Sequence, residues 1–275
     1  MIDFVFYAGV IAILLLASVA ARYDLLSEGG IAAALLVGLT IFWFGGWEWF
    51  LLLAAFFVIA SVFTKFKAKN RLKKIAMQES AKGGVRDFWQ VGANGALGAL
   101  IAVIYHFFPL NTFYFAYVGV IATVTADTLA TEIGVLSKRA FFLTTFQKAK
   151  SGLSGAVSFK GLAVSLLASV LIGLSALVIN AFFNFTAIDN FNLVLIPTVA
   201  GFFGALIDSL LGATIQAKFY CKKCRKITER ETHKCGIKTV YRTGWKSVNN
   251  DTVNLLASIS GAVIAALLYH LLKGF

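Results

Sequence analysis

Eight apolar segments constrain this chain more than any other feature of its sequence. They cover residues 4–21, 29–44, 47–64, 89–108, 113–136, 161–184, 193–216 and 252–272. A transmembrane helix needs about 20 apolar residues, and in lipid only helices or closed barrels satisfy every backbone hydrogen bond. The chain has 275 residues, 59% of them hydrophobic, and a mean hydropathy of +0.81. We therefore predict an all-α, polytopic bundle of about eight spans that forms a single transmembrane domain over residues 1–275.

Basic residues gather in three segments between these spans. The formal net charge is +12, and Lys and Arg concentrate within residues 65–87, 138–150 and 218–246. Cytoplasmic loops of membrane proteins are enriched in Lys and Arg. Because two spans separate each pair of segments, we expect all three on the cytoplasmic side and both chain termini outside. The protein is predicted to lie in the cell (inner) membrane and to contact anionic lipids there. The segments contain no recognisable nucleic-acid module, so nucleic acid is not expected as a partner.

Three aspartates lie within or at the edge of apolar segments: Asp127, Asp208 and Asp251. A carboxylate at membrane depth costs about 2.5–3.5 kcal/mol on translocon scales, and it is kept where it faces water, pairs or binds a cation. In the predicted topology all three lie toward the cytoplasmic side. For any one of them, a purely structural role in polar contacts between helices is the alternative to binding a cation. Mg²⁺ takes carboxylates together with phosphate oxygens, so we predict these aspartates as its ligands. Glu132 is a weaker candidate, because it lies about 140° around the helix from Asp127.

Residues 144–161 combine glycine, serine and lysine and contain no acid. Glycines let backbone N–H groups approach an anion, and a helix N-terminus, expected at the start of segment 161–184, favours negative charge. No Walker A sequence is present, and a flexible basic loop would have a similar composition. On the same side as the aspartates, this segment is predicted to bind phosphate through Lys148, Ser151, Gly152, Ser154, Gly155, Ser158 and Lys160.

All three cysteines fall in a predicted cytoplasmic insert, residues 218–248. They form the pattern Cys221-x₂-Cys224-x₈-His233-x-Cys235. Four such ligands can close a tetrahedral, structural Zn²⁺ site, whereas a cytoplasmic location disfavours disulfides. The pattern predicts a zinc site that pins the insert over the phosphate site, with free thiols as the alternative.

Five motifs occur in order along the chain. They are Arg86-Asp87-x-x-Gln90-Val91-x-x-Asn94-Gly95, Ala126-Asp127-Thr128-x-Ala130-Thr131-Glu132-x-Gly134, Ser151-Gly152-x-x-Gly155-Ala156-Val157-Ser158-x-x-Gly161, Gly204-x-x-x-Asp208-Ser209-x-x-Gly212-Ala213 and Asn250-Asp251-x-Val253-Asn254. Together they resemble an integral-membrane family, long of unknown function, that includes the plastid phytyl-phosphate kinase. The second and third motifs are also loosely similar to CTP-dependent dolichol and phytol kinases and to cytidylyltransferases.

The resemblance implies that CTP donates its γ-phosphoryl group to an isoprenoid (polyprenyl) monophosphate at the cytoplasmic face of the membrane. It implies that Asp127, Asp208 and Asp251 hold Mg²⁺ and that Asn94 and Asn254 contact phosphate or water around the ion. The glycine and serine segment would bind the nucleotide phosphates, and Arg86 and Lys148 would neutralise the transferred charge.

Two other function classes stay open at this point. One is a cytidylyltransferase or a kinase that acts on a free lipid alcohol, for which Asp87 or Glu132 could serve as the base. The other is an ion or solute transporter, since intramembrane acids and glycine-interrupted helices also mark transporters. Transport sites usually lie near the bilayer midplane, whereas these acids gather toward one side.

Overall fold

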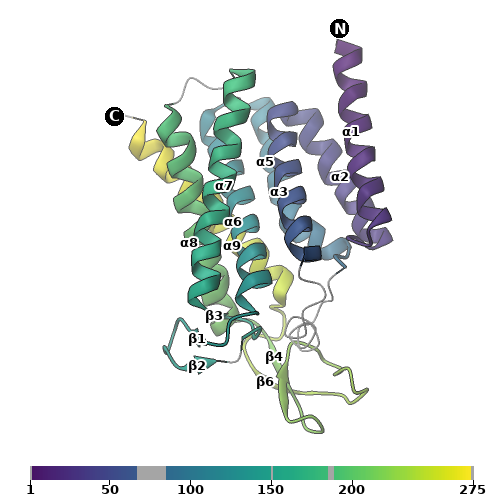
Figure 1. Ribbon diagram of the computed structural model, residues 1–275, viewed down its shortest axis with the longest axis vertical. Coiled ribbons are helices and arrows are strands. Elements are labelled where there is room, and N and C mark those ends of the chain that lie inside the picture. The colour runs from purple at the N-terminus through teal and green to yellow at the C-terminus, as the bar shows by residue number, and fades with distance from the viewer. Residues whose placement is uncertain (1, 67–84, 150, 185–188, 274–275) are drawn as a thin grey trace.

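The computed structural model describes residues 2–66, 85–149, 151–184 and 189–273 (Figure 1). Most of the basic segment 65–87, and Lys150 in the second basic segment, lie outside the described residues. Eight long helices lie within the described ranges: α1 (Ile2–Arg22), α2 (Glu28–Gly45), α3 (Trp47–Phe66), α5 (Phe88–Phe107), α6 (Asn111–Gly134), α7 (Phe159–Phe183), α8 (Asn190–Thr214) and α9 (Asn250–Leu272).

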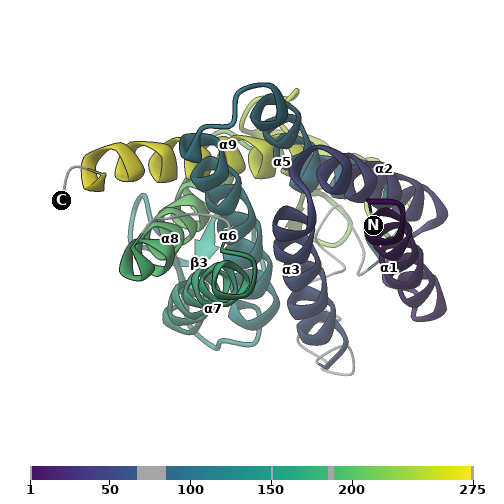
Figure 2. The same cartoon turned by 90° about the horizontal axis from the view of Figure 1, so that it is seen from above.

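These helices confirm the predicted polytopic helix bundle. Their ends differ from the predicted spans by at most three residues. Among the described residues, the seven helices after α1 are long and apolar enough to cross a membrane, and the part Phe6–Arg22 of α1 forms a shorter apolar helix. Successive helices run in alternating directions, so the start of α1 and the end of α9 lie at the same end of the bundle, on opposite sides of it (Figures 1 and 2).

The opposite end carries two small antiparallel sheets that the sequence did not predict. One has the order β2-β1-β3 and joins α6 to α7, and the other has the order β5-β4-β6 and lies between α8 and α9. Strands of two to four residues are too short for an alternating apolar pattern to reveal them. They are β1 (Ala140–Phe142), β2 (Lys148–Ala149), β3 (Ala156–Val157), β4 (Lys218–Cys221), β5 (Lys226–Thr228) and β6 (Val240–Thr243).

Helix α6 forms the centre of the bundle. Every residue from Tyr114 to Ala126 is buried, because α7, α8 and α9 pack around the helix and α3 and α5 cover its remaining side (Figure 2). Trp49 of α3 is fully buried, and its carbonyl oxygen accepts a 2.7 Å hydrogen bond from the hydroxyl of Tyr117. Its buried stretch includes the small residues Gly119, Thr123 and Thr125, which suit close helix packing in a membrane, and the helix carries Asp127 near the sheet-bearing end.

The outer faces of the bundle carry large apolar side chains. Leu36 on α2 is 62% exposed and Phe182 on α7 is 81% exposed. Water would not favour such a surface, whereas lipid would. Trp43 and Trp89 are exposed near opposite ends of the bundle, where interfacial aromatic residues are expected in membrane proteins.

Small residues allow the helices around α6 to approach closely. A Cβ atom at Gly261 of α9 would collide with the side chain of Thr123 and lie 2.9 Å from the carbonyl oxygen of Gly119, both on α6. A Cβ atom at Gly201 of α8 would lie 2.8 Å from the Cβ of Ala122. Close backbone packing replaces the hydrophobic effect as a source of stability in lipid.

This packing predicts opposite effects for two glycine substitutions. Gly261→Ala should lower the melting temperature of the detergent-solubilised protein by about 5 °C, because overpacking costs about 1–3 kcal/mol. Gly92→Ala on α5 is the matched control, since a Cβ atom there meets nothing within 4 Å, and it should leave the melting temperature unchanged or raise it. Equal melting temperatures for the two variants would contradict the packing described for α6 and α9.

Candidate active site

A cavity of about 270 Å³ lies at the sheet-bearing end of the bundle. The C-terminal half of α6 and the N-terminal turns of α5, α7 and α9 contribute to its walls, together with α8 and the segment 151–158. Arg86, just before α5, Thr64 of α3 and Glu229 of the insert also line it. Segments far apart in the sequence therefore bring their polar groups to one place.

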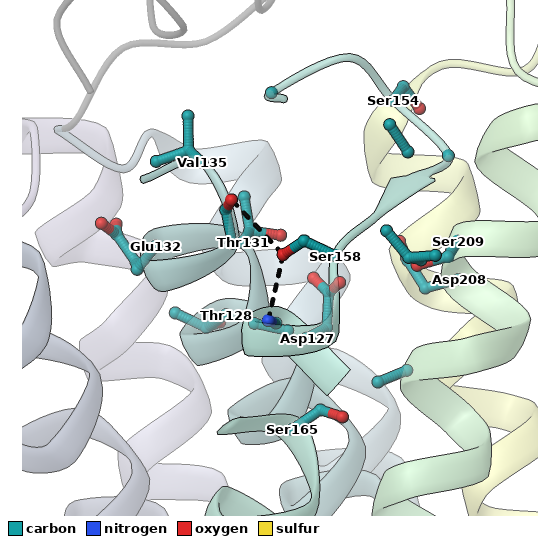
Figure 3. A pocket seen from close by; sticks show the side chains of 18 of the residues that line it. Asp127, Thr128, Thr131, Glu132, Val135, Ser154, Ser158, Ser165, Asp208 and Ser209 are labelled. Atoms are coloured by element: carbon teal, nitrogen blue, oxygen red, sulfur yellow. Dashed lines mark hydrogen bonds between the residues drawn. The ribbon is translucent and has the colours of Figure 1, made fainter. Parts of the chain in front are cut away.

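Asp127 of α6 and Asp208 of α8 are adjacent in this cavity. Both are half-buried, and their carboxyl groups lie within hydrogen-bonding reach of each other. Figure 3 shows the two side chains directed toward one another, with Glu132 turned away from them. Two carboxylates this close repel unless a proton or a cation lies between them. The pair is thus suited to hold a divalent cation.

Asn254 of α9 connects this pair to α5. Its Nδ2 atom lies 3.4 Å from Asn94 Oδ1, and in the alternative amide orientation Nδ2 donates to Asp208 Oδ2 at 3.1 Å. Asn250 also lines the cavity, whereas Asp251, which follows it in the first turn of α9, does not. Of the three predicted Mg²⁺ ligands, the structure brings two together and leaves Asp251 beside the site.

Arg86 is the cation among the described residues that line the cavity. Its backbone bonds to the α1–α2 connection, where its N–H donates to Leu25 and its carbonyl accepts from Ser27. The pKa of Arg86 is lowered by burial, and the nearby Glu132 carboxylate offsets part of this effect. Glu132 in turn accepts a 3.0 Å hydrogen bond from Thr64. Glu132 therefore faces Arg86 and α3 rather than the aspartate pair.

The predicted phosphate segment lies against the C-terminal end of α8. Gly152 and Gly155 have φ angles of +88° and +79°, which only glycine adopts readily. A Cβ atom at Gly155 would collide with the backbone of Ala213, so the segment can approach α8 only with glycine there. The glycines thus place residues 151–155 along the cavity wall.

The serine hydroxyls of this segment already have partners. Ser151 Oγ donates to the carbonyl of Ser137 at 2.5 Å, and Ser154 Oγ donates to the buried Gln216 side chain at 2.5 Å. Ser158 caps α7, where its Oγ accepts from the N–H of Gly161 at 3.1 Å (Figure 3). In this arrangement the serines hold the segment in shape. The backbone N–H groups of Ser154 and Gly155 have no acceptor among the described residues.

Two predicted lysines lie outside the cavity lining. Lys148 on β2 and Lys160 in the first turn of α7 are both exposed. They add positive charge around the site without contacting its interior. Asp87 also does not line the cavity, because its Oδ1 accepts from the N–H of Gln90 at 2.9 Å and caps α5. A role for Asp87 as a base on a lipid alcohol therefore has little geometric support.

Several lining residues were not predicted from the sequence, among them Thr64 and Glu229. Thr64 ends an apolar span and resembles any polar residue at a helix end. Glu229 lies in a basic insert, where a lone acid suggests only a surface charge. The sequence did contain a signal for Glu229. It lies between Cys224 and His233, and the zinc site predicted from these residues was expected to hold the insert over the phosphate site.

A second, apolar slot of about 90 Å³ lies between α1, α2, α3 and α5. Its walls are aliphatic and aromatic side chains such as Leu16, Ala34 and Phe57. Arg86 and Asn94 line this slot as well as the polar cavity. The slot and the cavity therefore share one cationic and one amide side chain in their walls.

Comparison with known proteins shows what this chain is similar to. It is 27% identical over 264 residues to an uncharacterized membrane protein of Methanocaldococcus jannaschii. The matched region covers 96% of this chain and 94% of that protein. It is 31% identical over 225 residues to Protein PGR of Arabidopsis thaliana, covering 75% and 77% of the two chains. No solved structure matches it.

A third relative and a family model agree with the resemblance inferred from the five motifs. The chain is 29% identical over 250 residues to Protein VTE6, chloroplastic, of Arabidopsis thaliana, covering 88% of this chain and 65% of that protein. The model for the integral membrane protein family DUF92 matches residues 11–262, which include all five motifs and the whole cavity. The chain therefore belongs to the DUF92 family of integral membrane proteins.

Proposed function

We propose that this protein is a CTP-dependent kinase that converts a polyprenyl monophosphate, of the phytyl, geranylgeranyl or farnesyl type, to the diphosphate at the cytoplasmic face of the cell membrane. The observation that carries the proposal is the junction at Arg86 and Asn94 between an acidic cavity and an apolar slot. A lipid phosphate has the same two parts, an anionic group and an apolar chain.

The aspartate pair would hold the magnesium ion of the nucleotide. Mg²⁺ is usually bound by one or two carboxylates, with the remaining positions filled by phosphate oxygens and water. Asp127 and Asp208 supply such a pair, and the amides of Asn254 and Asn94 lie next to it. When bound, the ion would neutralise charge on the β- and γ-phosphates. Asp251 would act at most indirectly, through the first turn of α9.

The segment 151–155 would bind the nucleotide phosphates through its backbone. The N–H groups of Ser154 and Gly155 are available on the cavity wall, and such groups bind anions when glycines shape the turn. The N-terminus of α7, capped by Ser158, adds a favourable dipole. Lys148 and Lys160 would raise the local concentration of the anionic nucleotide from outside the cavity.

The acceptor would enter through the apolar slot with its phosphate at Arg86. An oxygen of the monophosphate attacks the γ-phosphorus of CTP, the bond from that phosphorus to the bridging oxygen breaks, and CDP leaves with that oxygen. A phosphate monoester is already ionised at neutral pH, so no strong base is required. The guanidinium of Arg86 would offset the charge where the two phosphates meet, which is the main task in phosphoryl transfer.

Loss of either aspartate should abolish phosphoryl transfer. We expect Asp127→Asn and Asp208→Asn each to reduce diphosphate formation by about 100-fold or more in detergent, with Mg²⁺, CTP and phytyl or geranylgeranyl monophosphate. Asp189→Asn is the control, because Asp189 is exposed at the far end of the bundle and asparagine caps a helix equally well. Folded wild-type protein that binds CTP but yields no diphosphate from any such acceptor would overturn the proposal.

Filling the apolar slot should weaken the lipid substrate specifically. Ala34→Phe on α2 projects into the slot and should raise the KM for the prenyl phosphate about tenfold, since excluding two methylenes costs about 1.6 kcal/mol. The KM for CTP should stay the same. Ala32→Phe, on the exposed face of the same helix, is the matched control. Unchanged lipid KM in Ala34→Phe would mean that the tail binds elsewhere.

A further inference from the structure

The insert between α8 and α9 has no role in the reaction proposed above. Its sheet is small, with β4 pairing with β5 and β6. Residues 218–248 are mostly exposed, so apolar burial contributes little to their stability. A segment of this size usually needs a disulfide or a metal to hold its shape.

Two tight turns of the insert carry the cysteines and the histidine. The first turn connects β4 to β5, and in it the N–H of Cys224 points at Cys221 Sγ at 3.5 Å. The second turn is closed by a bridge between Thr232 and Lys238, and the N–H of Cys235 points at His233 Nδ1 at 3.4 Å. An N–H group directed at a cysteine sulfur, as at Cys221, is an outer contact that orients a metal ligand.

The four side chains converge on one point. One ligand atom from each lies within 4.8 Å of all the others. Cys221 Sγ and Cys235 Sγ are 3.6 Å apart, and His233 Nδ1 is 3.1 Å from Cys235 Sγ. A disulfide would require about 2.05 Å, whereas two sulfurs on a tetrahedral ion with bonds of about 2.3 Å lie about 3.8 Å apart. The three cysteines are free thiols, and the spacing fits an ion rather than a disulfide.

We propose that Cys221, Cys224, His233 and Cys235 bind one structural Zn²⁺ ion, and that this ion holds Glu229 at the mouth of the aspartate cavity. Zinc suits the mixed sulfur and nitrogen set, which fills all four positions and leaves none for substrate. Cys221 is fully buried and His233 is 8% exposed, as expected for a closed structural site.

Glu229 lies in the middle of the segment that the ion would close. Cys224 and His233 bound this segment, which contains β5 and then Glu229. Thr228, just before it, is buried, and the hydroxyl of Thr239 donates to the carbonyl of Arg230 at 2.7 Å. Both neighbours of Glu229 are therefore fixed within the insert.

Glu229 lines the cavity together with Asp208, and its negative charge acts on that carboxyl group. It also faces Lys218 of β4, whose pKa burial lowers and Glu229 raises. Glu229 is thereby a positioning group for the cation or the water around it. The zinc assignment stands without the proposed kinase reaction, whereas this role of Glu229 rests on it.

Metal analysis of the purified full-length protein tests the zinc site directly. Wild-type protein should contain one zinc per chain, and Co²⁺ in its place should give the visible absorption of a tetrahedral thiolate complex. Cys224→Ser and His233→Gln should each lower the zinc content at least tenfold, whereas His270→Gln, outside the cluster, should retain it. Wild-type protein without stoichiometric zinc, or a Cys224→Ser/Cys235→Ser variant that keeps it, would overturn the assignment.

A second pair of variants tests the connection to the cavity. Glu229→Gln should retain its zinc and raise the Mg²⁺ concentration needed for half-maximal activity about tenfold, as should wild-type protein stripped of zinc. Glu231→Gln is the control, because Glu231 is exposed two residues away. Unchanged Mg²⁺ dependence in Glu229→Gln would remove Glu229 from the site and leave the zinc assignment intact.

Discussion

The arrangement of the site depends on the pair of carboxylates from Asp127 and Asp208, whose charges must be compensated. Two like charges in one half-buried cavity are stable only with a cation or proton between them. A cation there would need further oxygen ligands, and the cavity provides space beside the pair. The amides of Asn94 and Asn254, the backbone of residues 151–155 and the guanidinium of Arg86 surround that space.

Helix packing explains how one central helix can carry such a charge. Helix α6 is buried from Tyr114 to Ala126 and becomes partly accessible toward its C-terminal end, from Asp127 on. Gly119 and Gly261 let α9 approach α6 closely, which brings Asn254 beside Asp208. Gly155 does the same for the segment after β2 against α8. Glycine therefore determines the shape of the site through close contact between backbones, and the polar residues supply its chemistry.

Much of this arrangement could be predicted from the sequence. The spans were predictable to within three residues, because a run of about 20 apolar residues has one solution in lipid. The strands were missed, because two to four residues carry no readable period. The segments that carry Lys148, Lys160 and Asp251 were predicted to form the site, but these three residues do not line the cavity. Only the packing of the helices decides which side of a turn faces the cavity. Glu229 required knowledge of how the insert folds back on the bundle.

The most direct test of the central claim is the fate of the phosphorus atoms of CTP. Purified protein would be given a prenyl monophosphate and Mg²⁺ with CTP labelled at either the α- or the γ-phosphorus, and the lipid and nucleotide products would be separated. The proposed reaction places the γ-label in a lipid diphosphate and leaves the α-label in CDP. Transfer of the α-label to lipid with release of pyrophosphate would instead identify a cytidylyltransferase and contradict the account.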